Sequence, residues 1–431
     1  MQATTALLTD HYELTMLQGA FTHGTAHRRS VFEVFARQLP GGRRYGVVAG
    51  TGRLLDAIEA FRFDDEALAH LSDTHVVDDT TLNWLGDYEF SGDIWGYAEG
   101  EPYFPHSPIL VVEASFADAV LLETITLSVM NHDSAVAAAA SRMIVAAAGR
   151  PCIEMGSRRT HEQAAVAAAR AAYIAGFNST SNLRAGQLYG LPTHGTSAHA
   201  FTLLHDTERD AFTAQVDTLG KGTTLLVDTY DVAEAVALGV EVAGTDLGAV
   251  RLDSGDLLVQ AHEVRAQLDA LGATKTRIVV TSDLDEHAIG ALAAAPVDGY
   301  GVGTSLVTGS GAPTAGLVYK LVARENDNKI MVPVEKRSAD KSGVGGRKRA
   351  ARRYNRHGVA DAEVIAINGE VTGADHRPLL VPLIRDGEIV GREPLDTARE
   401  RHHQRRSELP RTALQMSRGE PALPTYYEEQ P

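Results

Sequence analysis

Apolar and polar positions alternate regularly along the middle of the chain, between about residues 151 and 305. Each short apolar run is followed by a polar or glycine-containing turn and then by a stretch with helical spacing, often rich in alanine. Apolar strands that alternate with helices predict parallel βα units. About six or seven such units without a dinucleotide-binding glycine fingerprint favour a closed α/β barrel over an open sheet. The units begin at 151–156, 177–182, 192–201, 223–230, 249–256, 277–285 and 297–305.

The segments that flank this region have a different pattern. Residues 31–39 are rich in β-branched and aromatic residues, 88–104 resembles paired strands with glycine turns, and 109–116 is a candidate buried strand. We therefore expect an N-terminal α+β domain over 1–115, completed by about 335–431. The α/β barrel catalytic domain is expected over 116–334.

The C-terminal segment is basic. The runs 336–358 and 399–406 carry most of its positive charge, and we expect the second to be a solvated face or a mobile loop. The final stretch, GEPALPTYYEEQP, is expected to be a loosely ordered tail.

Composition and charge exclude several classes of protein. The 431 residues are 44% hydrophobic and 22% charged, which is typical of a globular chain, and the net charge is -16. Such an acidic chain is not expected to bind nucleic acid or anionic membranes non-specifically. Its single cysteine, Cys152, excludes an internal disulfide and a cysteine-based zinc site. No signal peptide is visible, and the longest apolar stretch, 135–149, is too short to span a bilayer. We expect a soluble, cytoplasmic protein.

Polar residues are concentrated where the predicted strands end. Active sites of α/β barrels lie at the carboxyl ends of the strands, because the loops that follow the strands meet there. The residues at these ends combine anion-binding and acidic types. They are Glu154, Gly156, Arg158, Arg159, Ser179, Thr180, Ser181, Thr196, His199, Asp228, Arg251, Asp253, Asp256, Ser282, Asp283, Gly301 and Gly303.

Three of these turns have the composition of an anion site. GYGVGTS (299–305) has glycines that let backbone N–H groups approach a phosphate, although an ordinary tight turn explains it equally well. RLDSGD (251–256) combines a cation with two carboxylates, where the simpler explanation is that Asp253 or Ser254 caps the next helix, with a surface ion pair. EMGSRRTH (154–161) places two arginines at a predicted helix start, against the helix dipole, which suggests an external anion unless one of them faces solvent.

GTSAH (195–199) is the fourth candidate turn. His199 follows Thr196 at a predicted strand-to-helix turn, and could act as a base, a phosphate ligand or a nucleophile. Spacing alone favours an ordinary solvent-facing histidine, as it does for His194 and His205.

Six motifs in order resemble the nicotinate phosphoribosyltransferase family over about Thr9 to Arg352: TDHY, FEVFARQLPGGRRYGVVAG, EMGSRRTH, GTSAH, RLDSGD and GVGTS. The resemblance implies an irregular α/β barrel with a second α+β domain formed from N- and C-terminal segments. It implies a homodimer with active sites at the subunit interface. It also implies that nicotinate and phosphoribosyl diphosphate form nicotinate mononucleotide and diphosphate, coupled to ATP hydrolysis, in NAD salvage.

The resemblance also implies roles for individual residues. His199 falls on the histidine that ATP phosphorylates, and Tyr12 on a ring that stacks on the pyridine of the neighbouring subunit's site. Arg251 and Asp253 fall on catalytic positions, the acid being near the ribose. The other implied substrate-binding residues are Asp10, Met155, Gly156, Arg158, Ser181, Thr196, Asp256, Ser282, Gly301, Gly303 and Thr304.

Two positions bear on the substrate. Met155 stands where relatives commonly carry an aromatic residue, and its thioether can still pack against a ring. Ser181 stands where the nicotinamide-using relatives carry Asp, so a substrate carboxylate would meet no repulsion, which favours nicotinate.

The implied reaction needs stabilisation of diphosphate rather than a strong base, because the ring nitrogen of nicotinate is already nucleophilic. Mg²⁺, entering with diphosphate, and Lys320, Lys336 or Lys348 are candidates for that role. The alternatives are a nicotinamide or quinolinate phosphoribosyltransferase, a non-catalytic barrel that binds a phosphorylated metabolite, and a barrel aldolase or lyase. The last usually needs a lysine within the barrel, and the strand ends from 151 to 305 carry none.

Overall fold

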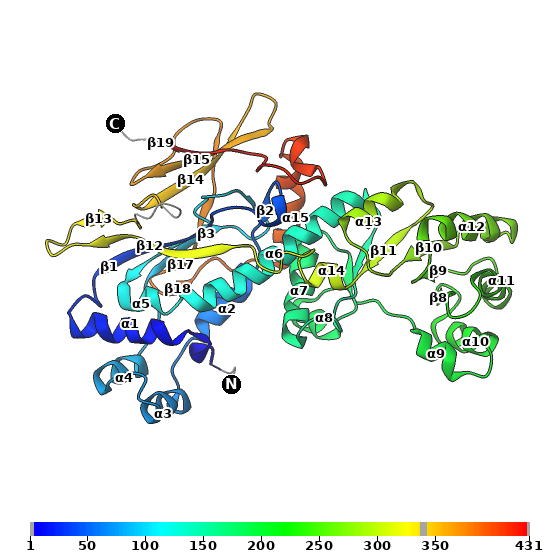
Figure 1. Cartoon of the computed structure of the whole chain (residues 1–431), viewed down its shortest axis with the longest axis horizontal. Helices are drawn as coiled ribbons and strands as arrows, with labels where there is room; N and C mark the ends of the chain where they lie inside the picture. Colours follow the sequence, from blue (N-terminus) through cyan, green and yellow to red (C-terminus); the bar gives the residue numbers. More distant parts are fainter. Residues whose placement is uncertain (1–3, 337–342, 429–431) are drawn as a thin grey trace. The chain divides into compact units, whose positions relative to one another are not determined.

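The computed structural model describes residues 4–336 and 343–428 (Figure 1). The chain divides into two compact units. We call Met1–Ala135 with Thr314–Pro431 the flanking unit, and Val136–Pro313 the barrel unit.

The barrel unit is built on a six-stranded parallel sheet with the strand order β7-β6-β11-β10-β9-β8. Along the chain, β8 to β11 are successive neighbours, and β11 then pairs with the first strand, β6. This is the order of a curled half-barrel, with β7 and β8 at the edges among the described strands, so the predicted α/β barrel is confirmed in this partly open form. The strands are β6 (Cys152–Glu154), β7 (Ser179–Thr180), β8 (Thr224–Leu226), β9 (Ala249–Leu252), β10 (Arg277–Val280) and β11 (Gly299–Val302).

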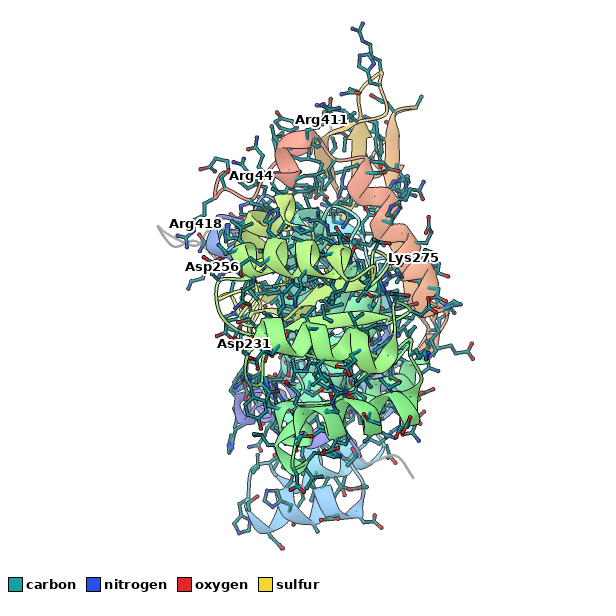
Figure 2. The ribbon with its side chains drawn as sticks, turned by 90° about the vertical axis from the view of Figure 1, so that its right-hand side faces the viewer. Arg44, Asp231, Asp256, Lys275, Arg411 and Arg418 are labelled. Carbon is teal, nitrogen blue, oxygen red and sulfur yellow. The ribbon has the colours of Figure 1, made fainter. Side chains whose placement is uncertain are left out.

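Helices follow these strands as the alternating pattern predicts. They are α7 (Glu162–Ala175), α8 (Leu183–Tyr189), α9 (His199–Leu204), α10 (Glu208–Leu219), α11 (Val232–Ala243), α12 (Leu257–Ala270), α13 (Glu286–Ala291) and α14 (Thr304–Val307). Asp231 caps α11 and Asp256 caps α12, each accepting a hydrogen bond from the backbone N–H of the residue three positions further on. Figure 2 shows both caps at the same end of their parallel helices, with Lys275 at the opposite end. The loops between strand ends and helix starts therefore gather along one edge of the sheet.

One predicted strand of this region is wrong. Residues 192–198 form a loop, which touches the sheet through a single bridge between Thr180 and Thr193, and α9 starts at His199. The segment lacks a long apolar run, because glycine, serine and histidine interrupt it, so it cannot occupy a buried sheet position.

The flanking unit contains a seven-stranded sheet of order β13-β12-β1-β5-β3-β17-β18, a four-stranded sheet of order β16-β14-β15-β19 and a short ribbon of β2 with β4. Its strands are β1 (Arg29–Ala36), β2 (Gly46–Val47), β3 (Asp93–Tyr97), β4 (Pro102–Tyr103), β5 (Leu110–Ser115), β12 (Leu317–Glu325), β13 (Met331–Pro333), β14 (Lys348–Tyr354), β15 (Ala360–Ile367), β16 (His376–Pro378), β17 (Leu380–Arg385), β18 (Glu388–Ile389) and β19 (Thr425–Glu428). Its helices include α1 (His11–Thr22), α2 (Thr51–Glu59), α3 (Asp65–Asp73), α4 (Asp79–Gly86), α5 (Phe116–Val120) and α15 (Leu395–Ser407).

The unit boundaries at 135/136 and 313/314 lie about twenty residues from the expected 115/116 and 334/335. Strand β12 belongs to the flanking unit because it pairs with β1 from Ser30↔Arg324 to Ala36↔Leu317. Helix α5 and the first turns of α6 (Glu123–Ala147) add side chains to the same core, among them Leu121, Ile125 and Val129. Long-range pairing of this kind leaves no local signal in the sequence.

Two further expectations are wrong, those for 88–104 and for the end of the chain. Strands β3 and β4, within 88–104, do not pair with each other: β3 pairs with β5 and β17, and β4 pairs with β2. The basic run 399–406 is part of helix α15 and is mostly exposed or half-buried, as expected of a solvated face, although His402 is buried and contacts the carbonyl of Gly100. The final stretch is partly ordered, since β19 pairs with β15. The other basic run includes β14, and its residues 337–342 lie outside the described part, as do 429–431 of the tail.

Among the described residues, no helix has both the length and the apolar character required to cross a lipid bilayer.

Candidate active site

A cavity of about 740 Å³ lies within the barrel unit, at the carboxyl ends of its strands. Its walls come from the turns after β6, β7, β9, β10 and β11 and from the loop that leads into α9. The lining residues are Met155, Ser157, Arg158, Arg159, Ser181, His194, Gly195, Thr196, Ser197, Ala198, His199, Ala200, Arg251, Asp253, Thr281, Ser282, Asp283, Gly301, Gly303 and Thr304.

His199 is the first residue of α9, and its imidazole faces two carboxylates. Its Nδ1 contacts the hydroxyl of Thr229 at 3.1 Å. Its Nε2 lies 3.8 Å from Asp228 Oδ1 and 3.9 Å from Asp253 Oδ2. The side chain is 40% exposed, so Nε2 is placed between acidic groups and remains open to a ligand in the cavity.

Asp228 is a buried carboxylate that connects His199 to the turn after β9. Its side chain is 2% exposed, and its Oδ2 accepts hydrogen bonds from the backbone N–H of Asp253 at 3.1 Å and from the Ser254 hydroxyl at 2.6 Å. Its other oxygen, Oδ1, is buried without a hydrogen-bond partner among the described residues. Since an unpaired buried carboxylate oxygen is costly, this oxygen favours a polar partner on its open side, where Nε2 of His199 lies 3.8 Å away.

Arg251 brings a cation into the same wall. Its guanidinium donates to the carbonyl of Ser197 at 3.1 Å, while its Nε is buried and has no hydrogen-bond partner among the described residues. Burial lowers the pKa of Arg251, the nearby Arg158 acts in the same direction, and Asp253 and Asp228 oppose them. A partly buried arginine beside a second cation is well placed to bind an anionic ligand.

The glycine positions are required by close packing. A Cβ on Gly301 would lie 2.6 Å from Thr281 Cγ2 and 2.7 Å from Met155 Sδ, and a Cβ on Gly156 would lie 2.2 Å from Val307 Cγ1. Gly301 therefore lets Met155 reach the cavity wall. Thr281 in turn donates a hydrogen bond to Asp253 Oδ1, which connects the β10 turn to the β9 turn.

Ser282 is strained. Its φ is 108°, a conformation that residues with a side chain rarely adopt, and it lies in the turn that follows β10. The structure thus holds a cavity residue in an unfavourable backbone geometry.

Most predicted site residues come together. The eleven that line the cavity are Met155, Arg158, Ser181, Thr196, His199, Arg251, Asp253, Ser282, Gly301, Gly303 and Thr304. Gly156 is not among the lining residues: it follows Met155 in the chain and packs against Val307. Asp256 does not line the cavity: it caps α12, accepting from the N–H of Val259 at 3.2 Å, whereas the sequence suggested Asp253 or Ser254 for a cap.

Arg158 and Arg159 do not lie at a helix start, contrary to the prediction from the sequence. Helix α7 begins at Glu162 and is capped by His161, so Arg158 and Arg159 lie in the preceding turn rather than at the helix start. They do not oppose the helix dipole, and their place in the cavity comes from the turn itself.

Several contributing residues were not assigned a role from the sequence. Thr229 and Asp228 flank His199, and Ser197 and Thr281 hold Arg251 and Asp253. The available signal was their position directly after apolar runs or within the GTSAH motif. Thr229 in particular directly follows Asp228, just beyond β8, which ends at Leu226.

The remaining predicted residues lie in the flanking unit. Asp10 precedes α1 and Tyr12 is in its first turn. Burial raises the pKa of Tyr12 to about 12, with Glu123, Glu13 and Asp10 adding to the effect.

The three candidate lysines line a separate cavity of about 300 Å³ together with Arg37 and His106. They are Lys320, Lys336 and Lys348. Of these lysines, Lys348 is buried against Glu33 at 2.7 Å.

The fold and the cavity define an α/β-barrel protein whose strand ends surround a cavity lined by Arg158, Arg159 and Arg251. Residues 7–131 match the model of the nicotinate phosphoribosyltransferase N-terminal domain. The chain is 57% identical to nicotinate phosphoribosyltransferase pncB1 of Mycobacterium tuberculosis, over 98% of this chain and 95% of that protein. It is 36% identical to the nicotinate phosphoribosyltransferase of Bacillus subtilis, over 81% of this chain and 73% of that protein.

A solved structure agrees with these matches. Human nicotinic acid phosphoribosyltransferase superposes with a TM-score of 0.83 at 26% identity, covering 98% of this chain and 97% of that one. The chain belongs to the nicotinate phosphoribosyltransferase family, whose members are enzymes that transfer a phosphoribosyl group.

Proposed function

We propose that this chain transfers the phosphoribosyl group of phosphoribosyl diphosphate to nicotinate, forming nicotinate mononucleotide and diphosphate in the salvage of NAD. One observation carries the proposal: in a member of this family, His199, Arg251, Asp253 and the Gly301–Thr304 turn line a single cavity. The net charge of -16 makes this local concentration of cations a specific feature of the cavity.

The transfer is a displacement at the anomeric carbon. The bond from that carbon to the nicotinate ring nitrogen forms, and the bond to the diphosphate oxygen breaks with its electron pair. Positive charge develops on the ribose ring and negative charge on diphosphate. Asp253 would stabilise the former, and Arg251 with Arg158 would bind anionic groups in the cavity.

The 5′-phosphate fits the turn after β11. Gly303 and Thr304 line the cavity there, and Gly303 has no side chain to block the approach of a phosphate to the backbone, whereas the space beside Gly301 is filled by Thr281 and Met155. This would fix the ribose with its anomeric carbon toward Asp253, so that catalysis depends chiefly on positioning.

Magnesium fits as an ion that enters with diphosphate. No group of three or more His, Cys, Asp or Glu side chains in the described part of the chain could hold a metal by itself. Asp253 and Asp283 line the cavity and would bind such an ion jointly with diphosphate oxygens. It would neutralise charge on the leaving group.

ATP coupling would act through His199. Because Nδ1 contacts Thr229, Nε2 is the nitrogen free to attack the γ-phosphorus of ATP, with ADP as the leaving group. Asp228 and Asp253 would stabilise the positive charge that develops on the ring. The phosphohistidine would place negative charge near the anomeric carbon and favour the productive complex until water hydrolyses it.

The substrate ring would pack against Met155. The neutral Ser181 side chain would not repel the carboxylate of nicotinate. Tyr12 would complete the ring's environment from a second copy of the chain, which makes a homodimer part of the proposal. The exposed Tyr12 side chain, 44% accessible, is consistent with such a role.

The test is diphosphate release with nicotinate, nicotinamide or quinolinate, each with and without ATP. Release with nicotinate, stimulated by ATP, supports the proposal. Equal or faster release with either other pyridine would assign a different substrate. Binding of phosphoribosyl diphosphate without release with any pyridine would leave only a non-catalytic barrel.

A further inference from the structure

A buried carboxyl connects the N-terminal turn of the flanking unit to helix α6. Glu13 lies in the first turn of α1, and its side chain is fully buried. Its Oε1 accepts a hydrogen bond from the backbone N–H of Thr124 at 2.9 Å and another from the Thr124 hydroxyl. Its Oε2 accepts from the Thr9 hydroxyl. One side chain thus holds both ends of the Thr9–Glu13 turn against the start of α6.

The turn that Glu13 holds contains Asp10 and Tyr12. The hydroxyl of Tyr12 hydrogen-bonds to Glu123, the residue next to Thr124, and Glu123 pairs with Lys320 at 3.6 Å. The backbone of the turn and the tip of its ring are therefore fixed to two successive residues of α6. Tyr12 cannot shift relative to α6 without disturbing one of these contacts.

Negative groups surround this carboxyl. Burial raises the pKa of Glu13 to about 7, and Glu123 acts in the same direction, while hydrogen bonds from Thr124 and Thr9 lower it. Its charge raises the pKa of two neighbouring tyrosines, Tyr12 of its own turn and Tyr319 of β12, and Asp10 acts on Tyr12 in the same direction.

Asp118 of helix α5 accepts hydrogen bonds from Ser115 and Ser91 and is not among the groups that shift the pKa of Glu13. Ionisation of Glu13 therefore puts a second charge beside Glu123, with no cation in direct contact to balance it among the described residues.

We propose that Glu13 is a positioning residue for the pyridine substrate: its uncharged carboxyl holds Tyr12 against α6, and its ionisation loosens that hold. The inference rests on the proposed function, in which Tyr12 packs on the nicotinate ring. Glu13 touches no substrate and acts only through Tyr12. Since a looser Tyr12 weakens ground-state and transition-state binding alike, ionisation raises KM for nicotinate and leaves kcat unchanged.

The experiment compares the wild type with Glu13→Gln, which keeps the shape and stays uncharged at every pH. KM and kcat for nicotinate are measured from pH 6 to 8.5 with saturating phosphoribosyl diphosphate. The ratio of the two KM profiles cancels titrations that both proteins share. We expect the wild-type KM to rise relative to the variant by about threefold or more, with a midpoint near pH 7, and the kcat ratio to stay constant.

A matched control is Glu66→Gln, the same substitution at an exposed position in the first turn of α3. Its KM ratio to the wild type should be flat. A flat ratio for Glu13→Gln would overturn the positioning role. Thr124→Val, which removes one donor to Glu13 and keeps the backbone N–H, should raise KM across the whole pH range.

Thermal unfolding tests the buried carboxyl without reference to activity. The pKa of Glu13 is higher in the folded state than the ordinary value near 4.5, so its contribution to stability is lost as pH rises from about 4.5 through about 7. The melting temperature of the wild type should fall relative to Glu13→Gln across that range, and parallel curves would overturn the proposal. If the wild type releases no diphosphate with nicotinate, the proposed function fails instead, before any variant is compared.

Discussion

The backbone N–H of Asp253 donates a hydrogen bond to the buried carboxylate of Asp228, 3.1 Å away. These residues follow neighbouring strands, β8 and β9, whose pairing runs from Thr224↔Ala249 to Leu226↔Arg251. The sheet register therefore sets the distance between the two acids, and both face the imidazole of His199. Because the imidazole and the two carboxylates come from different elements, a substitution of His199 and a substitution of Asp228 test their roles separately.

His199→Ala should lose the stimulation by ATP while retaining some nicotinate-dependent diphosphate release. The cavity and its cations remain, but no imidazole is available for phosphorylation. Rates with and without ATP, together with ³²P transfer from γ-labelled ATP to the protein, measure both effects. His262→Ala, on the exposed face of α12, is the control and should behave like the wild type. Equal ATP stimulation of the His199 variant and the wild type would refute the assignment.

Asp228→Asn should reduce phosphorylation of His199 about tenfold or more, because it removes a charge that stabilises the imidazolium while its oxygen can still accept from Asp253 and Ser254. The initial rate of ³²P incorporation gives the effect, and the melting temperature shows whether the fold is retained. Ser254→Ala removes one hydrogen bond to Asp228 without changing its charge, and it should cost much less. Equal losses from both variants would mean that hydrogen bonding, rather than charge, explains the role of Asp228.

Ser282→Gly should stabilise the protein or leave its stability unchanged, although glycine substitutions usually destabilise. The φ of 108° strains a serine by about 1–3 kcal/mol, which exceeds the entropic cost of about 0.5–1 kcal/mol for glycine. Ser282→Ala keeps the strain and should not stabilise. Chemical denaturation curves of the two variants test this, and a loss of more than about 1 kcal/mol for the glycine variant would contradict it.

Arg352→Ala should destabilise the flanking unit by about 3–5 kcal/mol. The Arg352 side chain is 1% exposed and pairs with the equally buried Glu363 and Glu101. Without Arg352 the buried Glu363 would lose this cation, whereas Glu101 keeps its pair with Arg377. Arg392→Ala is the matched control, because its pairs with Glu59 and Asp56 are on the surface and should contribute about 0–1 kcal/mol. Unfolding free energies from denaturant titration decide the matter, and similar values for both variants would disprove the role of burial.

Much of the barrel unit could be predicted because its signals are local. Apolar strands such as 277–280 and capped helices such as α12 are encoded within about twenty residues of chain, and their alternation restricts the sheet to parallel order. The candidate site followed from the same reasoning. Residues near the carboxyl ends of parallel strands, such as Arg251 and Gly301 within their strands and Ser282 just after β10, must lie at one edge of the sheet.

The sequence by itself thus determined the alternation of strands and helices, the family, and the polar groups at the strand ends. Only the tertiary structure decided which partners they contact. Asp256 caps its helix, and Asp228 lies next to His199. Strand β3 pairs with β5 rather than with β4, and His402 of α15 is buried. The reason is physical. Strand composition and helix capping depend on neighbours along the chain, whereas pairing and burial depend on contacts between residues far apart, whose free energies are comparable for many alternatives until the whole core is assembled.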